Sequence, residues 1–247
     1  MASKDEKAEG EIRRLWDLEP GSRPGPKATH SARTIAKAGV KIADSEGLAA
    51  VSMRKVAARL SVSPMSLYNQ IPGKAELLEL MIDEVSGEML APTSGAWRTR
   101  AETILWRNWE WYLQHPWLLQ TDSYRPVLGP NVLQKYEIEL AAFEDIGLSD
   151  TEMDFALGSL LAMVKGCAMS AIDADGLIKD GGDPAVWWET RKPALDALRI
   201  ESRFPLATRV GSAVGAYANG PSAPKATLQF GFACWCSGIT DARKRKA

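Results

Sequence analysis

Residues 52–74 read SMRKVAARLSVSPMSLYNQIPGK, which is two short helical patterns joined by a three-residue turn at 61–63. Apolar residues recur along one edge of both patterns, so we expect the two segments to share one small core. This edge consists of Val56, Leu60, Val62, Leu67 and Ile71. Ser63 can cap the second segment, and Pro64 suits its first position, where no N–H is needed. The stretch therefore predicts a helix–turn–helix.

The outward face of the second segment carries small and amide side chains. Such side chains can hydrogen-bond base edges in a major groove or touch a thymine methyl. We therefore interpret residues 64–70 as a DNA recognition helix. The side chains expected to read or approach bases are Ser63, Pro64, Met65, Ser66, Asn69 and Gln70.

The arrangement resembles the DNA-binding domain of the TetR family of transcriptional regulators over about residues 29–90. The most specific part is the pattern Leu67-Tyr68-x-x-Ile71-x-x-Lys74, after which Ala75-Glu76-Leu77-Leu78 resembles the start of the family's long connecting helix. Upstream, Arg33-Thr34-Ile35 opens the family's usual first helix. Ser61 departs from the family's common glycine in the turn, so we expect slight strain there. Ile71 replaces the common phenylalanine with a smaller apolar anchor.

Phosphate contacts are expected from residues at both edges of the motif. The resemblance assigns them to Tyr68 and Lys74, and a phenol donor and an ammonium group suit that role. Ser52 matches a family position usually held by threonine. Its hydroxyl can cap the first helix or donate to a phosphate, and both interpretations remain open. We expect Arg54 and Lys55 to contact the neighbouring backbone.

Basic charge is concentrated at this end of a chain whose net charge is only −1. Residues 21–74 hold nine lysines and arginines against two acidic residues, a net charge of +7. Such a patch releases condensed counterions from DNA and makes binding salt dependent. Arg23 and Lys27 lie in a segment rich in proline and glycine. It is either a basic arm for the DNA backbone or minor groove, or an inert leader.

Composition and periodicity indicate an all-α protein. The chain has 247 residues, of which 45% are hydrophobic and 25% charged. Neither a hydrophobic signal region nor a run of eighteen apolar residues occurs, so we expect a cytoplasmic protein without a membrane partner. The expected parts are an N-terminal extension (1–28), a helix–turn–helix domain (29–76) and a helical ligand-binding and dimerisation domain (77–247). Helices are predicted at about 31–46, 52–60, 64–70, 74–91, 97–114, 116–121, 130–147, 150–173, 184–200, 205–217 and 225–243.

Two of these helices carry long apolar stripes. The family resemblance implies that 150–173 and 225–243 pair with their copies in a four-helix dimer interface. The alternative is that both stripes are buried within one subunit. One short recognition helix reads few bases, whereas a two-fold dimer reads a palindrome, so we expect a homodimer. Its predicted interface residues are Leu160, Val164, Leu228, Phe232, Trp235 and Ile239.

Tryptophans are dense between residues 97 and 117. Aromatic side chains at that density either pack a core or line a pocket for a flat or hydrophobic ligand. His115 precedes Pro116, so a capping or surface role is the alternative to ligand binding for this residue. Polar ligand partners are sought among Arg107, Asn108, Glu110 and His115. The predicted ligand residues are Trp106, Trp109, Leu113, His115, Trp117, Tyr124, Phe155 and Met163.

The sequence gives little support for a redox, metal-binding or catalytic site. Cys167, Cys234 and Cys236 are interpreted as reduced core thiols, with a redox sensor as the alternative. The acidic stretch 173–183 is interpreted as a solvated loop, because Pro184 stands where a calcium loop would place its closing glutamate. No metal or cofactor is expected. The absence of GxSxG and phosphate-binding glycine loops argues against an enzyme that uses the aromatic pocket.

The function predicted from these features is that of a ligand-responsive transcriptional regulator. We expect a homodimer that binds a palindromic operator and is released by a small hydrophobic or aromatic effector. Repression is the habit of the TetR family, and activation or dual regulation on the same fold is the alternative. A structural protein that binds nucleic acid without sequence preference would be more basic overall and would need no pocket.

Overall fold

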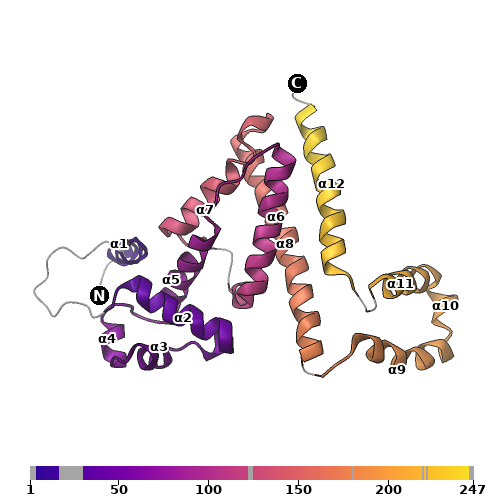
Figure 1. Cartoon of the computed structure of the whole chain (residues 1–247), viewed down its shortest axis with the longest axis horizontal. Helices are drawn as coiled ribbons and strands as arrows, with labels where there is room; N and C mark the ends of the chain where they lie inside the picture. The colour runs from indigo at the N-terminus through magenta and orange to yellow at the C-terminus, as the bar shows by residue number, and fades with distance from the viewer. Residues whose placement is uncertain are drawn as a thin grey trace, which may run out of the picture. The chain divides into compact units, whose positions relative to one another are not determined.

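The computed structural model describes residues 4–16, 30–121, 125–179, 181–218, 220 and 222–244, which form helices and loops without a strand (Figure 1). The predicted all-α fold is confirmed. The chain divides into two compact units, Met1–Leu157 and Gly158–Ala247, with the division inside one long helix. The expected domain boundary after residue 76 lies within the first unit and stays a prediction.

The first unit contains the helix–turn–helix and the tryptophan-rich segment. Its 3₁₀ turns are η1 (Leu48–Ala50), η2 (Gly87–Met89), η3 (Pro116–Gln120) and η4 (Glu144–Ile146). Its α-helices are α1 (Lys4–Leu15), α2 (Ala32–Glu46), α3 (Met53–Leu60), α4 (Pro64–Tyr68), α5 (Lys74–Ser86), α6 (Trp97–Gln114), α7 (Pro130–Leu140) and the start of α8 (Asp150–Lys179).

The core of the DNA-binding end is built around α2. The apolar residues of α2 at Ile35 and Ile42 are fully buried, together with Val56 of α3 and Leu67 of α4. Leu60 and Val62 pack against this core at its edge. The predicted apolar edge of the two short helices is therefore confirmed. Burial of each such side chain contributes about 1.5–3 kcal/mol, which holds helices that are too short to be stable alone.

The N-terminus of α7 is capped by a side chain from α5. The Asp83 carboxylate is buried and accepts hydrogen bonds from the backbone N–H groups of Asn131 (2.9 Å) and Val132 (3.1 Å). The cap residue of α7 is Gly129, which has no side chain to do this. A Cβ at Gly129 would lie 2.1 Å from Asp83 Oδ1, so glycine is required because the carboxylate occupies that space.

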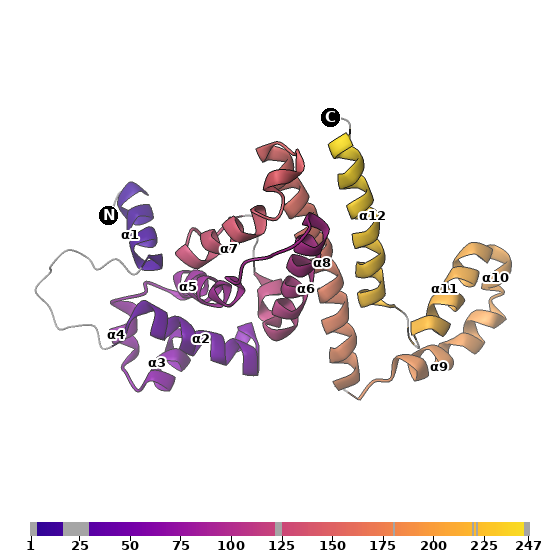
Figure 2. The same ribbon diagram turned by 45° about the horizontal axis from the view of Figure 1, so that its top comes forward.

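The second unit comprises the rest of α8 and four further helices. In both Figure 1 and Figure 2 this part of α8 lies beside α12. Trp235 Nε1 donates to Ser159 Oγ at 2.9 Å, and a Cβ at Gly231 would lie 2.5 Å from Met163 Sδ, which shows how closely the helices approach. The four helices are α9 (Pro184–Ala197), α10 (Ile200–Arg203), α11 (Pro205–Ala218) and α12 (Pro224–Lys244).

Two predicted boundaries of these helices were wrong. The acidic stretch that begins at Asp173 is not a loop, because α8 continues to Lys179 and the chain turns at Gly181, which has φ +81°. The glycine at 176 stays helical. The segment predicted as one helix over 184–200 is two, with Arg199 in the left-handed region (φ 50°) between them.

One stretch of α8, Asp150–Gly176, is long and apolar enough to cross a membrane by length and composition, with a mean hydropathy of 1.7. Polar residues interrupt this stretch, so it contains no continuous apolar run of eighteen residues and was not predicted from the sequence. Because the core helix of a globular protein passes the same test, the stretch does not by itself assign the chain to a membrane.

Candidate DNA-binding and effector sites

The recognition helix α4 is fixed from its inner side. Leu67 and Ile71 are fully buried, and Ser63 Oγ accepts the Ser66 N–H at 3.2 Å, with Pro64 at the first helical position. The predicted cap is confirmed. The helix ends at Tyr68, two residues before the predicted end, although Asn69 keeps helical backbone angles. A five-residue helix is thus held in place by its core contacts and cap.

The outer side of α4 is open to solvent. Met65 and Tyr68 are 70% and 47% exposed. Ser63, Pro64 and Asn69 are exposed as well, and Ser66 and Gln70 are partly buried. The residues predicted to face DNA therefore share one accessible surface, which we call the recognition face (63–66 and 68–70).

The turn before α4 adopts the conformation that glycine favours. Ser61 has φ 57° and ψ 37°, and its N–H bonds to the carbonyls of Ala57 and Ala58. A left-handed residue other than glycine costs about 1–2 kcal/mol. The strain expected from the Gly-to-Ser departure is therefore present in the backbone, and the hydrogen bonds that close α3 offset it.

The predicted phosphate-contacting residues have partners within the protein. Ser52 Oγ accepts the Lys55 N–H at 3.2 Å, so its capping role is confirmed, and its phosphate contact stays a prediction. Lys55 pairs with Glu46. Lys74 Nζ donates to the Leu48 carbonyl at 3.3 Å, from the first position of α5. A cation at a helix N-terminus opposes the helix dipole, so helix stability does not account for Lys74.

The charge of the DNA-binding end is smaller than the sequence count suggested. Glu84 of α5 lies 3.0 Å from Arg33 and 3.6 Å from Lys37, both on α2. Glu84 lies outside residues 21–74 in the sequence, but the fold places it beside these two basic side chains.

Arg54 is exposed on α3. Arg23 and Lys27 lie outside the described residues, so their contacts stay predictions. The short helix α1 packs against α5, and Trp16 Nε1 donates to the Leu128 carbonyl at 3.0 Å.

The predicted ligand residues of the first unit do not line a common cavity. Trp109 and Trp117 are buried in the core, whereas Phe155 is 67% exposed. Trp106 faces a groove, and its ring meets that of Trp109 edge-on at 6.2 Å. Leu113 is partly buried. Met163 belongs to the second unit, where it packs against Gly231, and Tyr124 lies outside the described residues.

The groove that Trp106 faces runs along one side of α6 and has a volume of about 590 Å³, within the range of ligand pockets. Residues four apart on α6, such as Thr99, Thr103, Arg107 and Trp111, bring one helix face to it. Arg107 donates to the Ala91 carbonyl across the groove. The lining residues are Glu88, Met89, Ala91, Thr99, Glu102, Thr103, Trp106, Arg107, Glu110, Trp111 and Gln114.

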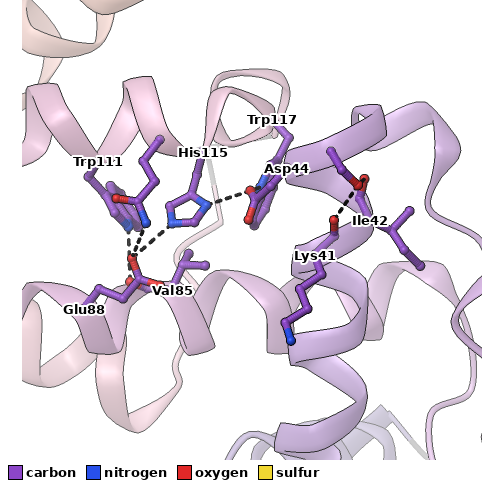
Figure 3. A network of polar contacts seen from close by, with 10 residues as sticks. Lys41, Ile42, Asp44, Val85, Glu88, Trp111, His115 and Trp117 are labelled. Atoms are coloured by element: carbon purple, nitrogen blue, oxygen red, sulfur yellow. Dashed lines mark hydrogen bonds and ion pairs between the residues drawn. The ribbon is translucent and has the colours of Figure 1, made fainter. Parts of the chain in front are cut away.

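His115 is a buried link between α2 and η2, which corrects the expectation of a surface or capping role. Its side chain is almost fully buried, and its ring lies between Asp44 and Glu88 (Figure 3). Nδ1 lies 2.7 Å from Asp44 Oδ1, and Nε2 lies 3.1 Å from Glu88 Oε2. Trp117 Nε1 also donates to Asp44 Oδ1 at 2.7 Å. Both ring nitrogens are engaged, so His115 and Trp117 serve the linkage and have no free polar atom for a ligand.

A second polar cluster, which the sequence analysis missed, joins α6 to α7. Asn108 Nδ2 donates to Glu139 Oε1 at 2.7 Å, and Lys135 Nζ donates to both Glu139 oxygens at 2.7 and 2.8 Å. Lys135 also lies 5.4 Å from the Trp111 ring centre. Burial, with a smaller contribution from Glu139, raises the pKa of Tyr112 to about 12. The i, i+4 spacing of Lys135 and Glu139 was visible, but their burial was not.

The predicted dimer residues divide by exposure. Leu160, Val164 and Leu228 are buried within the single chain, whereas Phe232, Trp235 and Ile239 are partly exposed. Phe232 and Trp235 stack at 5.8 Å. The dimer interface stays a prediction, with the outward residues of α12 as its stronger part.

The cysteines differ in exposure. Cys236 is buried and Cys167 partly buried, where burial raises the pKa of the Cys167 thiol. Cys234 is exposed, so it is not the core thiol that was expected. Residues two apart point to different sides of a helix, which explains the contrast between 234 and 236.

Comparison with known proteins places the chain in a family. The model for bacterial regulatory proteins of the tetR family matches residues 35–81, and that for the Tetracyclin repressor-like C-terminal domain matches residues 91–224. The HTH-type transcriptional repressor DrrR1 of Streptomyces coeruleorubidus is 37% identical over 198 residues, which cover 78% of this chain and 73% of the relative. An HTH-type transcriptional regulator of Saccharopolyspora erythraea is 32% identical over 154 residues, covering 61% and 64%.

Solved structures share the fold. Apo ActR from Streptomyces coelicolor has a TM-score of 0.73 at 22% identity, covering 90% of this chain and 100% of ActR. ActR in complex with actinorhodin has a TM-score of 0.70 at 24% identity, covering 86% and 96%. Together with the exposed recognition face, the two family models and the 37% identical repressor define a helix–turn–helix transcriptional regulator. The chain belongs to the TetR family, so the prediction of a DNA-binding regulator without an enzymatic role is confirmed.

Proposed function

We propose that this regulator is a repressor that binds a palindromic operator as a homodimer and leaves it when a small molecule binds near α6. The recognition face carries the proposal, because its polar and flexible side chains are exposed while Leu67 and Ile71 fix the helix from behind. The similarity to a relative named as a repressor supports repression over activation. The complex of ActR with actinorhodin supports a ligand-controlled mechanism on this fold.

The proposed operator contacts divide into two classes. Met65, Asn69 and Gln70 would contact base edges, since they lie on the outer side of α4. Tyr68 and Lys74 would contact phosphates at the two edges of the recognition face. Lys74 keeps two N–H donors beyond its bond to Leu48. A dimer would place two such faces on half-sites about one DNA turn apart.

Selection of bound sequences from a random DNA pool tests the proposal directly. A palindromic site should emerge and outcompete bulk DNA by at least about a thousandfold. Light scattering on the selected complex should give the mass of two chains on one site. Addition of protein to a transcription template with the site at its promoter should lower transcript yield. Selection of no common sequence would refute operator recognition, and a rise in transcript would indicate activation.

Lys74→Ala separates phosphate from base contacts. The substitution should weaken binding to every sequence and reduce the salt slope of log K by about one. Lys192→Ala is the matched control, because Lys192 is an exposed lysine on α9 that pairs with Asp196. Asn69→Ala should instead weaken the selected site by about 1–3 kcal/mol and leave bulk DNA binding unchanged. An unchanged slope in Lys74→Ala would remove Lys74 from the contact set.

A further inference from the structure

The groove along α6 is strongly acidic as well as aromatic. Glu88, Glu102 and Glu110 line it, against the single guanidinium of Arg107. That guanidinium donates to the Ala91 carbonyl, so it is held against one wall. Among the described residues, neither Glu102 nor Glu110 has an ion pair or hydrogen bond. The groove therefore offers carboxylates that no cation of the described chain neutralises.

The same groove presents an aromatic wall. The partly exposed Trp106 indole lines it and is oriented by its edge-on contact with Trp109. Met89 and Ala91 add apolar surface. A tryptophan face attracts cations and also stacks on flat rings. Carboxylates beside an indole in a hollow of about 590 Å³ suit a ligand that is both aromatic and positively charged.

One of these carboxylates is connected to the DNA-binding helices. Glu88 Oε2 lies 3.1 Å from His115 Nε2, and the other ring nitrogen of His115 lies 2.7 Å from Asp44 on α2 (Figure 3). The Glu88 side chain is 47% exposed, so a ligand in the groove can reach it. A cation that binds Glu88 would compete with His115 for the same oxygen. Binding would then loosen the contact that ties His115 to η2.

We propose that the α6 groove is the effector site, that its ligand is an aromatic molecule with a cationic amine, and that Glu88 and His115 transmit its binding to α2. The proposal rests on the proposed function, since it names the ligand class and the transmitting residues of that ligand-controlled regulator. Ligand affinity and operator affinity should then change each other by the same factor.

The binding test uses three anthracenes that differ only in charge: 9-(aminomethyl)anthracene, 9-anthracenemethanol and 9-anthracenecarboxylate. Fluorescence titration of the full chain without DNA should show the amine binding at least about tenfold tighter than the alcohol, and the carboxylate weakest. The double substitution E102Q/E110Q should remove most of the amine's advantage in affinity over the alcohol, since only Glu88 then remains, and should leave the affinity for the alcohol unchanged. Glu137→Gln is the control, because Glu137 is an exposed glutamate on α7 outside the groove.

The transmission test adds the DNA site selected above. The amine should lower operator affinity in the wild type, and it should still bind His115→Phe without lowering operator affinity. If His115→Phe fails to fold, Asp44→Asn serves the same purpose, because it weakens the contact between His115 and α2 without changing a residue that lines the groove. Equal binding of the three anthracenes, or an amine affinity unaffected by E102Q/E110Q, would overturn the groove assignment. With either result, the proposed function would still hold if another compound released the protein from its operator. Failure of the protein to bind any operator would refute the proposed function itself.

Discussion

The cap that α5 provides for α7 makes a quantitative prediction about two residues 46 positions apart in sequence, Asp83 and Gly129. In the folded chain, a Cβ at Gly129 would lie 2.1 Å from Asp83 Oδ1 and 2.4 Å from Cγ. Gly129→Ala must therefore displace the carboxylate that accepts the Asn131 and Val132 N–H groups. Asp83→Ala removes the same carboxylate directly. The two substitutions should thus damage one shared interaction.

Each single substitution should cost about 2–4 kcal/mol, from loss of an N-cap and from two backbone donors left without their acceptor. Once Asp83 is alanine, the added methyl of Gly129→Ala enters vacated space. The double variant should then be no less stable than Asp83→Ala alone, which gives a coupling as large as the cost of Gly129→Ala, about 2–4 kcal/mol. Asp83→Asn keeps an acceptor oxygen and should stay within about 1 kcal/mol of the wild type.

The assay is equilibrium unfolding in urea, followed by circular dichroism, for the wild type, both single variants and the double variant. Gly211→Ala is the control, because a Cβ there meets nothing within 4 Å in α11. It should stabilise the protein by up to about 1 kcal/mol through helix propensity. Additive costs in the double variant would refute the reasoning, since they would mean that Gly129 and Asp83 act on separate interactions.

Three further predictions concern the turn, the recognition face and the interior. Ser61→Gly should raise the free energy of unfolding by up to about 1 kcal/mol, because glycine relieves the left-handed strain. Urea denaturation measures this gain. No gain would mean that the hydrogen bonds of the Ser61 N–H already offset the strain. Met65→Ala should change the free energy of unfolding by less than about 0.5 kcal/mol, whereas Leu67→Ala should lower it by about 2–5 kcal/mol. DNA binding can therefore be measured on a stably folded protein only with Met65→Ala. Burial raises the pKa of Tyr112 to about 12, above its ordinary value, so stability is intact below pH 10 and is lost as pH rises towards 12. By pH 11 the wild type should lose about 1 kcal/mol that Tyr112→Phe keeps, and identical pH profiles would contradict the burial of Tyr112.

Local patterns predicted the helices and the recognition face well, because each depends on residues close in sequence. The span of α6 agrees with the prediction at both ends, and the cap by Ser63 follows from a serine before a proline. The Ser61 turn was identified from one departure at a position that needs a left-handed backbone. Signals of this kind depend on periodicity and on backbone geometry, which a single segment contains.

The contacts that connect segments could not be predicted in this way. His115 meets Asp44 across 71 positions, and nothing beside Pro116 indicates that the ring turns inward. Lys135 and Glu139 are spaced like an ordinary surface pair on a helix, yet the fold buries them beneath Trp111. The density of tryptophans in the sequence predicted one pocket. The sequence does not show which tryptophans face the core, and Trp109 and Trp117 are buried there while Trp106 lines the groove.

Three consecutive residues of α5 explain why a change on the effector side can reach the DNA-binding side. Asp83 caps α7, Glu84 pairs with Arg33 and Lys37 on α2, and the Val85 carbonyl accepts the Trp111 Nε1 of α6 at 3.1 Å. Successive residues of a helix point about 100° apart, so one turn of α5 contacts three neighbours at once. Because these contacts are hydrogen bonds and ion pairs at one helix end, a displacement of α6 or α7 would stretch contacts of α5. The pair of Glu88 and His115 adds a second connection between η2 and α2, one turn further along the chain. A ligand beside α6 would therefore act on helices that share contacts with α2. The difference between its contacts in the two states of the protein would set the size of the shift in operator affinity.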